Sequence, residues 1–89
     1  METASLTLIG RPGCHLCDDA RTVVTRVMDE LSSRPDAPAL TLDEVSILDD
    51  AELNAKYAEE IPVLLINGRV HNYWRIDPVR LTNALLELT

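Results

Sequence analysis

The Asn67-Gly68 pair lies between two apolar runs and constrains the fold more than any other feature of this sequence. Both positions tolerate a positive φ, so the pair is the strongest short signal for a β-hairpin. The run 62–66 before it is apolar on both faces, as in a central strand that is covered from both sides. We therefore predict that the run 70–76 after it forms an antiparallel strand beside 62–66.

The chain before the hairpin changes between strand and helix periods. Residues 5–10 alternate apolar with polar side chains and end at a glycine, which predicts a strand. Residues 16–31 carry apolar side chains at helical spacing and predict a helix. Residues 40–47 predict a second strand, but its apolar phase shifts midway, which suggests a bulge or two short pieces. The segment 32–38, between the helix 16–31 and the strand 40–47, contains two prolines and predicts a loop.

Two further helices are predicted from their starting residues. Asp49 with Glu52 three residues later resembles a capping box for a short helix that continues to about Tyr57. The dipeptide 77–78, an Asp followed by Pro, is typical of the start of a helix. This last helix is expected to bury a stripe made of Leu81, Leu85 and Leu88.

The predicted order is strand, helix, strand, helix, strand, strand, helix. A helix between the first two strands makes a crossover unit, which is right-handed in nearly all proteins. The expected result is a four-stranded mixed sheet with helices on both faces, in the α/β or α+β class. A chain of 89 residues is too short for two separate cores, so we expect residues 1–89 to form one domain.

Composition excludes several classes of function. Eight basic and fifteen acidic residues give a net charge of −7, which disfavours nucleic acids and anionic membrane surfaces as partners. The chain start has no signal-peptide pattern, and no run of apolar residues is long enough to span a bilayer. We therefore expect a cytoplasmic protein, in a compartment where thiols are kept reduced.

The only two cysteines, Cys14 and Cys17, lie at the junction between the first predicted strand and the first predicted helix. Unpaired N–H groups and the positive end of the helix dipole stabilise a thiolate at a helix start, and the thiolate is the nucleophile. Cys17 lies one helical turn further on, so its sulfur can reach that of Cys14. The spacing therefore predicts thiol–disulfide exchange with one attacking and one resolving thiol, and it requires no metal, nucleotide or flavin.

Other interpretations of these residues stay open at this point. The two thiols could be part of a zinc site with His15, His71 or carboxylates, although structural zinc needs four ligands. The chain could also be a non-enzymatic interaction module, a metal carrier, or a protein whose cysteine pair is inert. His15 either favours the Cys14 thiolate or is an exposed residue of the helix start. Arg11 either contacts the thiolate or the substrate, or is a solvated loop charge.

The segment 11–17 (Arg-Pro-Gly-Cys-His-Leu-Cys), the Ile61-Pro62 pair before an apolar strand, and the closing hairpin and helix together resemble the thioredoxin fold. More narrowly, they resemble small bacterial glutaredoxin-like proteins, and the likeness covers nearly the whole chain. The resemblance implies the order β-α-β-α-β-β-α and a cis Ile61-Pro62 bond that faces the cysteines. It also implies that Ile61 and Pro62 shape a platform for an extended substrate segment. Arg11 stands where glutaredoxins often carry lysine.

The chain also departs from glutaredoxins. It has His15-Leu16 where they have Pro-Tyr or Pro-Phe, and 73–78 replaces the Gly-Gly and acidic pair that help them to hold glutathione. We expect Tyr73 and Trp74 to point to opposite faces of the last strand, and His71 to lie at the surface.

The expected partners and cofactors follow from this resemblance. The substrate is expected to be a disulfide-containing protein or a small thiol. The reductant is glutathione, another low-molecular-weight thiol or a flavoprotein of the thioredoxin-reductase type. We expect a monomer with no tightly bound cofactor.

Overall fold

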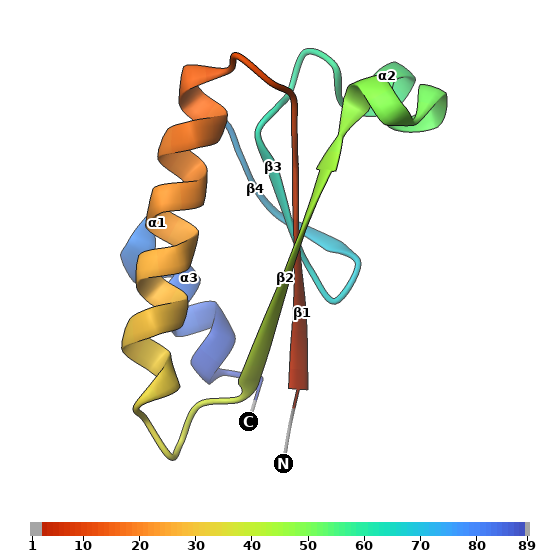
Figure 1. Cartoon of the computed structure of the whole chain (residues 1–89). Coiled ribbons are helices and arrows are strands. Elements are labelled where there is room, and N and C mark those ends of the chain that lie inside the picture. Colours follow the sequence, from red (N-terminus) through yellow and green to blue (C-terminus); the bar gives the residue numbers. More distant parts are fainter. Residues whose placement is uncertain (1–2, 89) are drawn as a thin grey trace.

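The computed structural model describes residues 3–88, and its helices and strands follow the predicted order (Figure 1). The elements are β1 (Thr3–Gly10), α1 (His15–Ser32), β2 (Ala39–Ser46), the 3-10 turn η1 (Ile47–Asp49), α2 (Ala51–Tyr57), β3 (Val63–Ile66), β4 (Arg69–Tyr73) and α3 (Pro78–Leu86).

The four strands form one mixed sheet in the order β2-β1-β3-β4. β1 and β2 are parallel, because α1 carries the chain back across the sheet, whereas β3 is antiparallel to both β1 and β4. The predicted hairpin is confirmed, since Asn67 and Gly68 have φ values of 52° and 82°. Asn67 also fixes the hairpin to β1, because its side chain accepts a hydrogen bond from the Ser5 N–H (2.9 Å).

Helices cover both faces of the sheet, as predicted (Figure 1). α1 and α3 lie on one face, over a larger core in which Leu6 and Leu64 of the sheet meet Val24 and Leu81 of the helices. α2 covers only one end of the other face, over a smaller core made of Ile9, Ile47, Tyr57 and Val63. This smaller core lies at the carboxyl end of β1, where the chain enters α1.

The predicted bulge in β2 is wrong. β2 pairs with β1 without interruption from Ala39 to Ser46, and the irregularity of the sheet lies between β3 and β4 instead. Successive residues of a strand face opposite sides, so Leu40, Leu42 and Glu44 all point toward α1. Glu44 there accepts a hydrogen bond from Arg21 of α1. The apolar pattern of β2 changes phase at residue 44 because the Glu44–Arg21 ion pair replaces an apolar contact with α1 at this position.

Three element ends also differ from the sequence prediction. The cap of α2 is Asp50, not Asp49, because the Asp50 carboxylate accepts the N–H groups of residues 52 and 53. β4 ends at Tyr73, since Trp74 has a φ of 58° and leaves the strand. Leu88 lies beyond the end of α3 and is 38% exposed, so it is not part of the buried stripe.

His71 is half-buried in β4, whereas the sequence had predicted a surface residue. Its Nε2 atom is buried and has no hydrogen-bond partner within residues 3–88. It lines a cleft of about 480 Å³ beside α3, together with Arg80 and Asp77. Burial, and to a lesser extent the charge of Arg80, lower the pKa of His71.

Gly10 ends β1 directly beneath α1. A methyl group on this residue would lie 2.9 Å from Cys17 Sγ and 3.2 Å from Cys17 Cβ. Cys17 is 2% exposed and its Sγ is bonded to Cys14, so its side chain is not free to turn away. The missing side chain of Gly10 is therefore what allows the first turn of α1 to approach the end of β1.

We expect the Gly10→Ala variant to lose about 1–3 kcal/mol of stability, the usual cost of overfilling a packed site. It should also change the reactivity of Cys17 toward alkylating reagents after reduction. The control is Gly68→Ala, where nothing lies within 4 Å but φ is +82°, so that only backbone strain is added. Urea unfolding and thiol alkylation check both effects, and equal Cys17 reactivity in the two variants would contradict the packing argument.

Acid should weaken the fold through His71. The folded state favours the neutral imidazole, so the unfolded chain takes up the proton first as the pH falls below the ordinary pKa of 6.5. The stability that this group contributes is present above that pH and is lost below it. In urea titrations at about pH 7.5 and about pH 5.5, His71→Asn should lose less stability on acidification than the unchanged chain. His15→Asn, which removes an exposed imidazole, is the control, and an equal response of the two variants to acid would contradict the assignment to His71.

Candidate active site

Cys14 caps the amino end of α1. Its backbone is extended (φ −101°, ψ 112°), and its carbonyl oxygen accepts the Asp18 N–H at 3.1 Å. Its Sγ accepts the Cys17 N–H, also at 3.1 Å, as the oxygen of a serine or aspartate cap would. The predicted position at the helix start is confirmed, and an N–H group directed at the sulfur favours its anionic form.

Cys17 lies one turn further along α1 and forms a disulfide with Cys14, with the two Cα atoms 5.2 Å apart. The two sulfurs have different surroundings. Cys14 is half-buried at the helix end, whereas Cys17 is buried between α1 and Gly10. A molecule in solution therefore reaches Cys14 before Cys17.

The Ile61-Pro62 bond is cis, as the family resemblance implied. Ile9 of β1 pairs with Val63 of β3, so Pro62 follows this register to the end of the sheet where Gly10 lies. Figure 1 shows the chain segment before β3 at the same end of the molecule as the turn from β1 into α1. The fold thus brings Ile61 and Pro62 to the cysteine end of the sheet, with Pro62 buried and Ile61 half-buried.

Trp74 holds the chain beside Pro62, and the sequence had given no sign of this. Its N–H donates to the Pro62 carbonyl at 2.7 Å, and its indole Nε1 donates to the Glu59 carbonyl at 3.3 Å. Trp74 remains 54% exposed, and Tyr73 is exposed too, with ring centres 6.2 Å apart. The prediction that the two rings point to opposite faces of one strand is wrong, because the strand ends between them.

A cleft of about 310 Å³ on one side of the disulfide brings Arg11 to the same space as Cys17. Arg21 lies in it as well, with Asp18 (2.9 Å) and Glu44 as ion-pair partners. Hydrogen bonds to Glu44 and Asp18 raise the pKa of Arg21, so its charge is permanent but balanced. Arg11 has no ion pair within residues 3–88, but Asp49 lines the same cleft, where three acidic side chains face two arginines.

A second cleft, of about 110 Å³, lies on the other side of the first turn of α1. Leu16 and Asp19 of α1 line it together with Trp74 and Arg75. His15 is exposed on the same turn and lines neither cleft. Among the site residues predicted from the sequence, His15 is therefore the one whose surroundings in the structure indicate no role.

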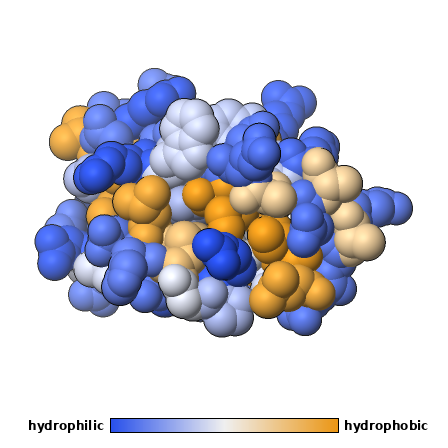
Figure 2. Space-filling model, turned by 90° about the horizontal axis from the view of Figure 1, so that it is seen from above, coloured by the Kyte–Doolittle hydropathy of each residue, from blue (hydrophilic) through white to orange (hydrophobic). Residues whose placement is uncertain are grey.

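Apolar side chains gather around this end of the molecule. Figure 2 looks down on it and shows hydrophobic residues that extend from the middle to one edge, among mostly hydrophilic ones. The exposed apolar residues that the elements of this end supply are Leu16 of α1, Leu48 of η1 and Trp74. A surface of this kind fits a partly apolar partner better than a purely ionic one.

Two negative findings concern the described part of the chain. Within residues 3–88, no cluster of three or more His, Cys, Asp or Glu side chains is arranged to hold a metal ion. No helix in the same range is long and apolar enough to cross a membrane.

Known proteins resemble this chain over nearly all of its length. Uncharacterized proteins of Mycobacterium tuberculosis and Mycobacterium bovis are 28% identical to it over 81 residues, which are 91% of this chain and 81% of each relative. The X-ray structure of a structural genomics target protein from X. campestris is 31% identical, with a TM-score of 0.68, and covers 94% of this chain and 97% of its own.

More distant structures resemble the chain in fold alone. The solution structure of a protein from Nitrosomonas europaea has a TM-score of 0.76 at 21% identity, over 96% of this chain and 94% of that one. The germline-specific thioredoxin Deadhead of Drosophila melanogaster has a TM-score of 0.61 at 18% identity, over 99% of this chain and 83% of that one. These likenesses confirm the thioredoxin fold. The model of the family described as "Glutaredoxin-like domain (DUF836)" matches residues 5–86, and the chain therefore belongs to this glutaredoxin-like family.

Proposed function

We propose that the protein is a thiol–disulfide oxidoreductase that works through Cys14 and Cys17. The observation that carries this proposal is the unequal placement of the two sulfurs: one caps a helix at the surface, and the other is buried one turn away within bonding reach. An exchange reaction through a mixed disulfide needs one accessible and one protected thiol.

In the proposed reaction, the Cys14 thiolate attacks one sulfur of a substrate disulfide, and the other substrate sulfur leaves as a thiolate. The Cys17 thiolate then attacks the Cys14 sulfur and releases the second substrate thiolate. The substrate gains two electrons, and the Cys14–Cys17 disulfide forms. Two thiols of a reductant restore the pair by the reverse steps.

Three groups around the cysteines support binding in this proposal. Arg11, which forms no ion pair within residues 3–88, lies in the cleft beside Cys17 and would favour a thiolate or contact a substrate carboxylate. Ile61 and Pro62 would form the platform on which an extended substrate segment lies. Trp74 lies across the carbonyl groups of this loop, so a substrate meets an indole ring beside the platform.

The natural reductant and compartment belong to the same proposal. The cycle consumes two thiols per turnover, which glutathione, another low-molecular-weight thiol or a flavoprotein reductase can supply. A cytoplasmic location is consistent with this requirement, because thiols are kept reduced there. We further propose that the protein acts as a monomer, without a tightly bound cofactor, on a disulfide-containing protein or a small-thiol substrate.

Single cysteine variants test the assigned roles. With oxidised glutathione as the probe, reduced Cys17→Ser should form a mixed disulfide at Cys14 at least about tenfold faster than reduced Cys14→Ser forms one at Cys17. The reason is that Cys14 is accessible and receives an N–H group, whereas Cys17 is buried. Mass spectrometry follows the adducts. Equal rates in the two variants, or no adduct in either, would contradict the proposal.

His15→Ala tests whether the side chain beside Cys14 affects its charge. An imidazole with partial positive charge favours the thiolate, so its removal should raise the pKa of Cys14 and make the disulfide less oxidising. Thiolate absorbance against pH and equilibrium with a glutathione buffer measure the two effects. Leu16→Ala removes an uncharged side chain from the same turn and should leave both unchanged. An unaltered thiolate titration in His15→Ala would show that His15 has no such role.

A further inference from the structure

β2 is the edge strand of the sheet and pairs with β1 alone, from Ala39 to Ser46. In a parallel ladder, every second residue of an edge strand directs its N–H and C=O groups away from the sheet. Four of the eight residues of β2 therefore present backbone donors and acceptors that a further strand can use.

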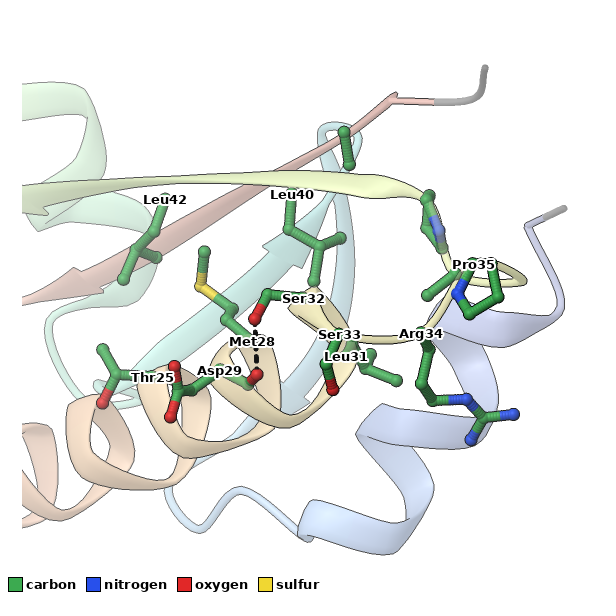
Figure 3. Close-up of a pocket in the computed structure, with 13 residues that line it drawn as sticks. Thr25, Met28, Asp29, Leu31, Ser32, Ser33, Arg34, Pro35, Leu40 and Leu42 are labelled. Atoms are coloured by element: carbon green, nitrogen blue, oxygen red, sulfur yellow. Dashed lines mark hydrogen bonds between the residues drawn. The ribbon is translucent and has the colours of Figure 1, made fainter.

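A groove of about 810 Å³ runs beside this edge, between β2 and the second half of α1. Figure 3 shows Leu40 and Leu42 directed from β2 toward Met28 of α1, with Thr25 further along the helix. Leu40, Leu42 and Met28 are only half-buried at the margin of the larger core. An open apolar groove next to an unpaired strand edge has the two features that β-strand addition requires.

We propose that this edge binds an extended segment of another protein, which adds to β2 as an antiparallel strand. Backbone hydrogen bonds would hold it, and every second side chain would enter the groove against Leu40 and Leu42. The groove lies at the carboxyl end of α1, away from the cysteines at its amino end (Figure 1). This binding is therefore separate from the proposed exchange reaction.

The charges along β2 define the partner more closely. Glu44 is paired with Arg21, and Arg34 at the far end of the groove is paired with Asp36 (2.6 Å). Asp43 is exposed and has no ion pair within residues 3–88. In a strand antiparallel to β2, four successive residues lie opposite Asp43, Leu42, residue 41 and Leu40, in that order. The partner segment is thus basic, apolar, polar and apolar in that order.

The same charges argue against a second copy of this chain as the occupant. Residues 39–46 contain two acidic side chains and no basic one, so two β2 edges cannot supply the cation that Asp43 lacks. Each chain also carries a net charge of −7, and two copies repel each other.

The test uses the peptide acetyl-Thr-Lys-Val-Thr-Val-Thr-amide and the full-length protein labelled with ¹⁵N. We expect saturable amide shifts confined to residues 25–34 and 37–46, with a Kd of about 1 mM or tighter. One variant is methylated at the two valine nitrogens, and another at the nitrogens of the lysine and the last two threonines. Binding should be abolished in one of the two, because alternate N–H groups of a strand face the same side and only one set faces β2. Replacement of both valines by serine should weaken binding at least about fivefold through loss of apolar burial.

A charge exchange provides the matched control. Replacement of the peptide lysine by glutamate should weaken binding about threefold or more, and Asp43→Lys should reverse that preference. Absence of saturable shifts, shifts located elsewhere, or equal affinity of all peptides would overturn the proposal. Self-association of the protein through β2, seen as a concentration-dependent mass in sedimentation, would also overturn it, because the occupant would then be a second copy.

Discussion

The contact between Cys17 and Gly10 is the constraint on which the rest of the site depends. α1 can begin directly above the end of β1 only because Gly10 has no side chain where Cys17 Sγ lies. This contact buries one sulfur and leaves the other at the helix end, where it accepts an N–H group. The register between Ile9 and Val63 then brings the cis-proline loop to the same end. The close contact of Gly10 with the Cys17 side chain and the register of β1 with β3 together set the relative positions of these three segments.

Much of this arrangement could be predicted from short-range patterns. The spacing of apolar residues and the Asn67-Gly68 pair determine the order and direction of the elements, since each signal depends on neighbours within a few residues. The cysteine spacing likewise determines that one sulfur caps the helix while the other lies a turn beyond it. The details that could not be predicted depend on contacts between distant residues. Glu44 disturbs the apolar phase of β2 because it pairs with Arg21, and no rule within the strand indicates that partner.

Trp74 illustrates the same limit at the site itself. A tryptophan with a positive φ is unusual, and nothing in residues 73–78 indicates it. The conformation is held by two hydrogen bonds to carbonyl groups of the loop that contains Pro62. These bonds occupy the backbone N–H and the indole N–H of Trp74, so what Trp74 offers a bound molecule is chiefly the face of its ring. Glutathione beside a Gly-Gly pair depends on close approach to the protein backbone. The exposed ring of Trp74 suits an apolar group of a partner better than it suits such a ligand.

α1 connects the two regions for which we propose functions. Its buried stripe consists of Cys17, Ala20, Val24, Val27 and Leu31, one row along a helix of 18 residues. The row begins at the disulfide and ends beside the groove along β2, and its two ends are about 21 Å apart at 1.5 Å per residue. Every turn between them packs against the sheet, so the helix has no hinge at which one end could move without the other. The proposed electron exchange at the cysteines and the proposed strand addition at β2 therefore lie at the two ends of one helix that packs against the sheet.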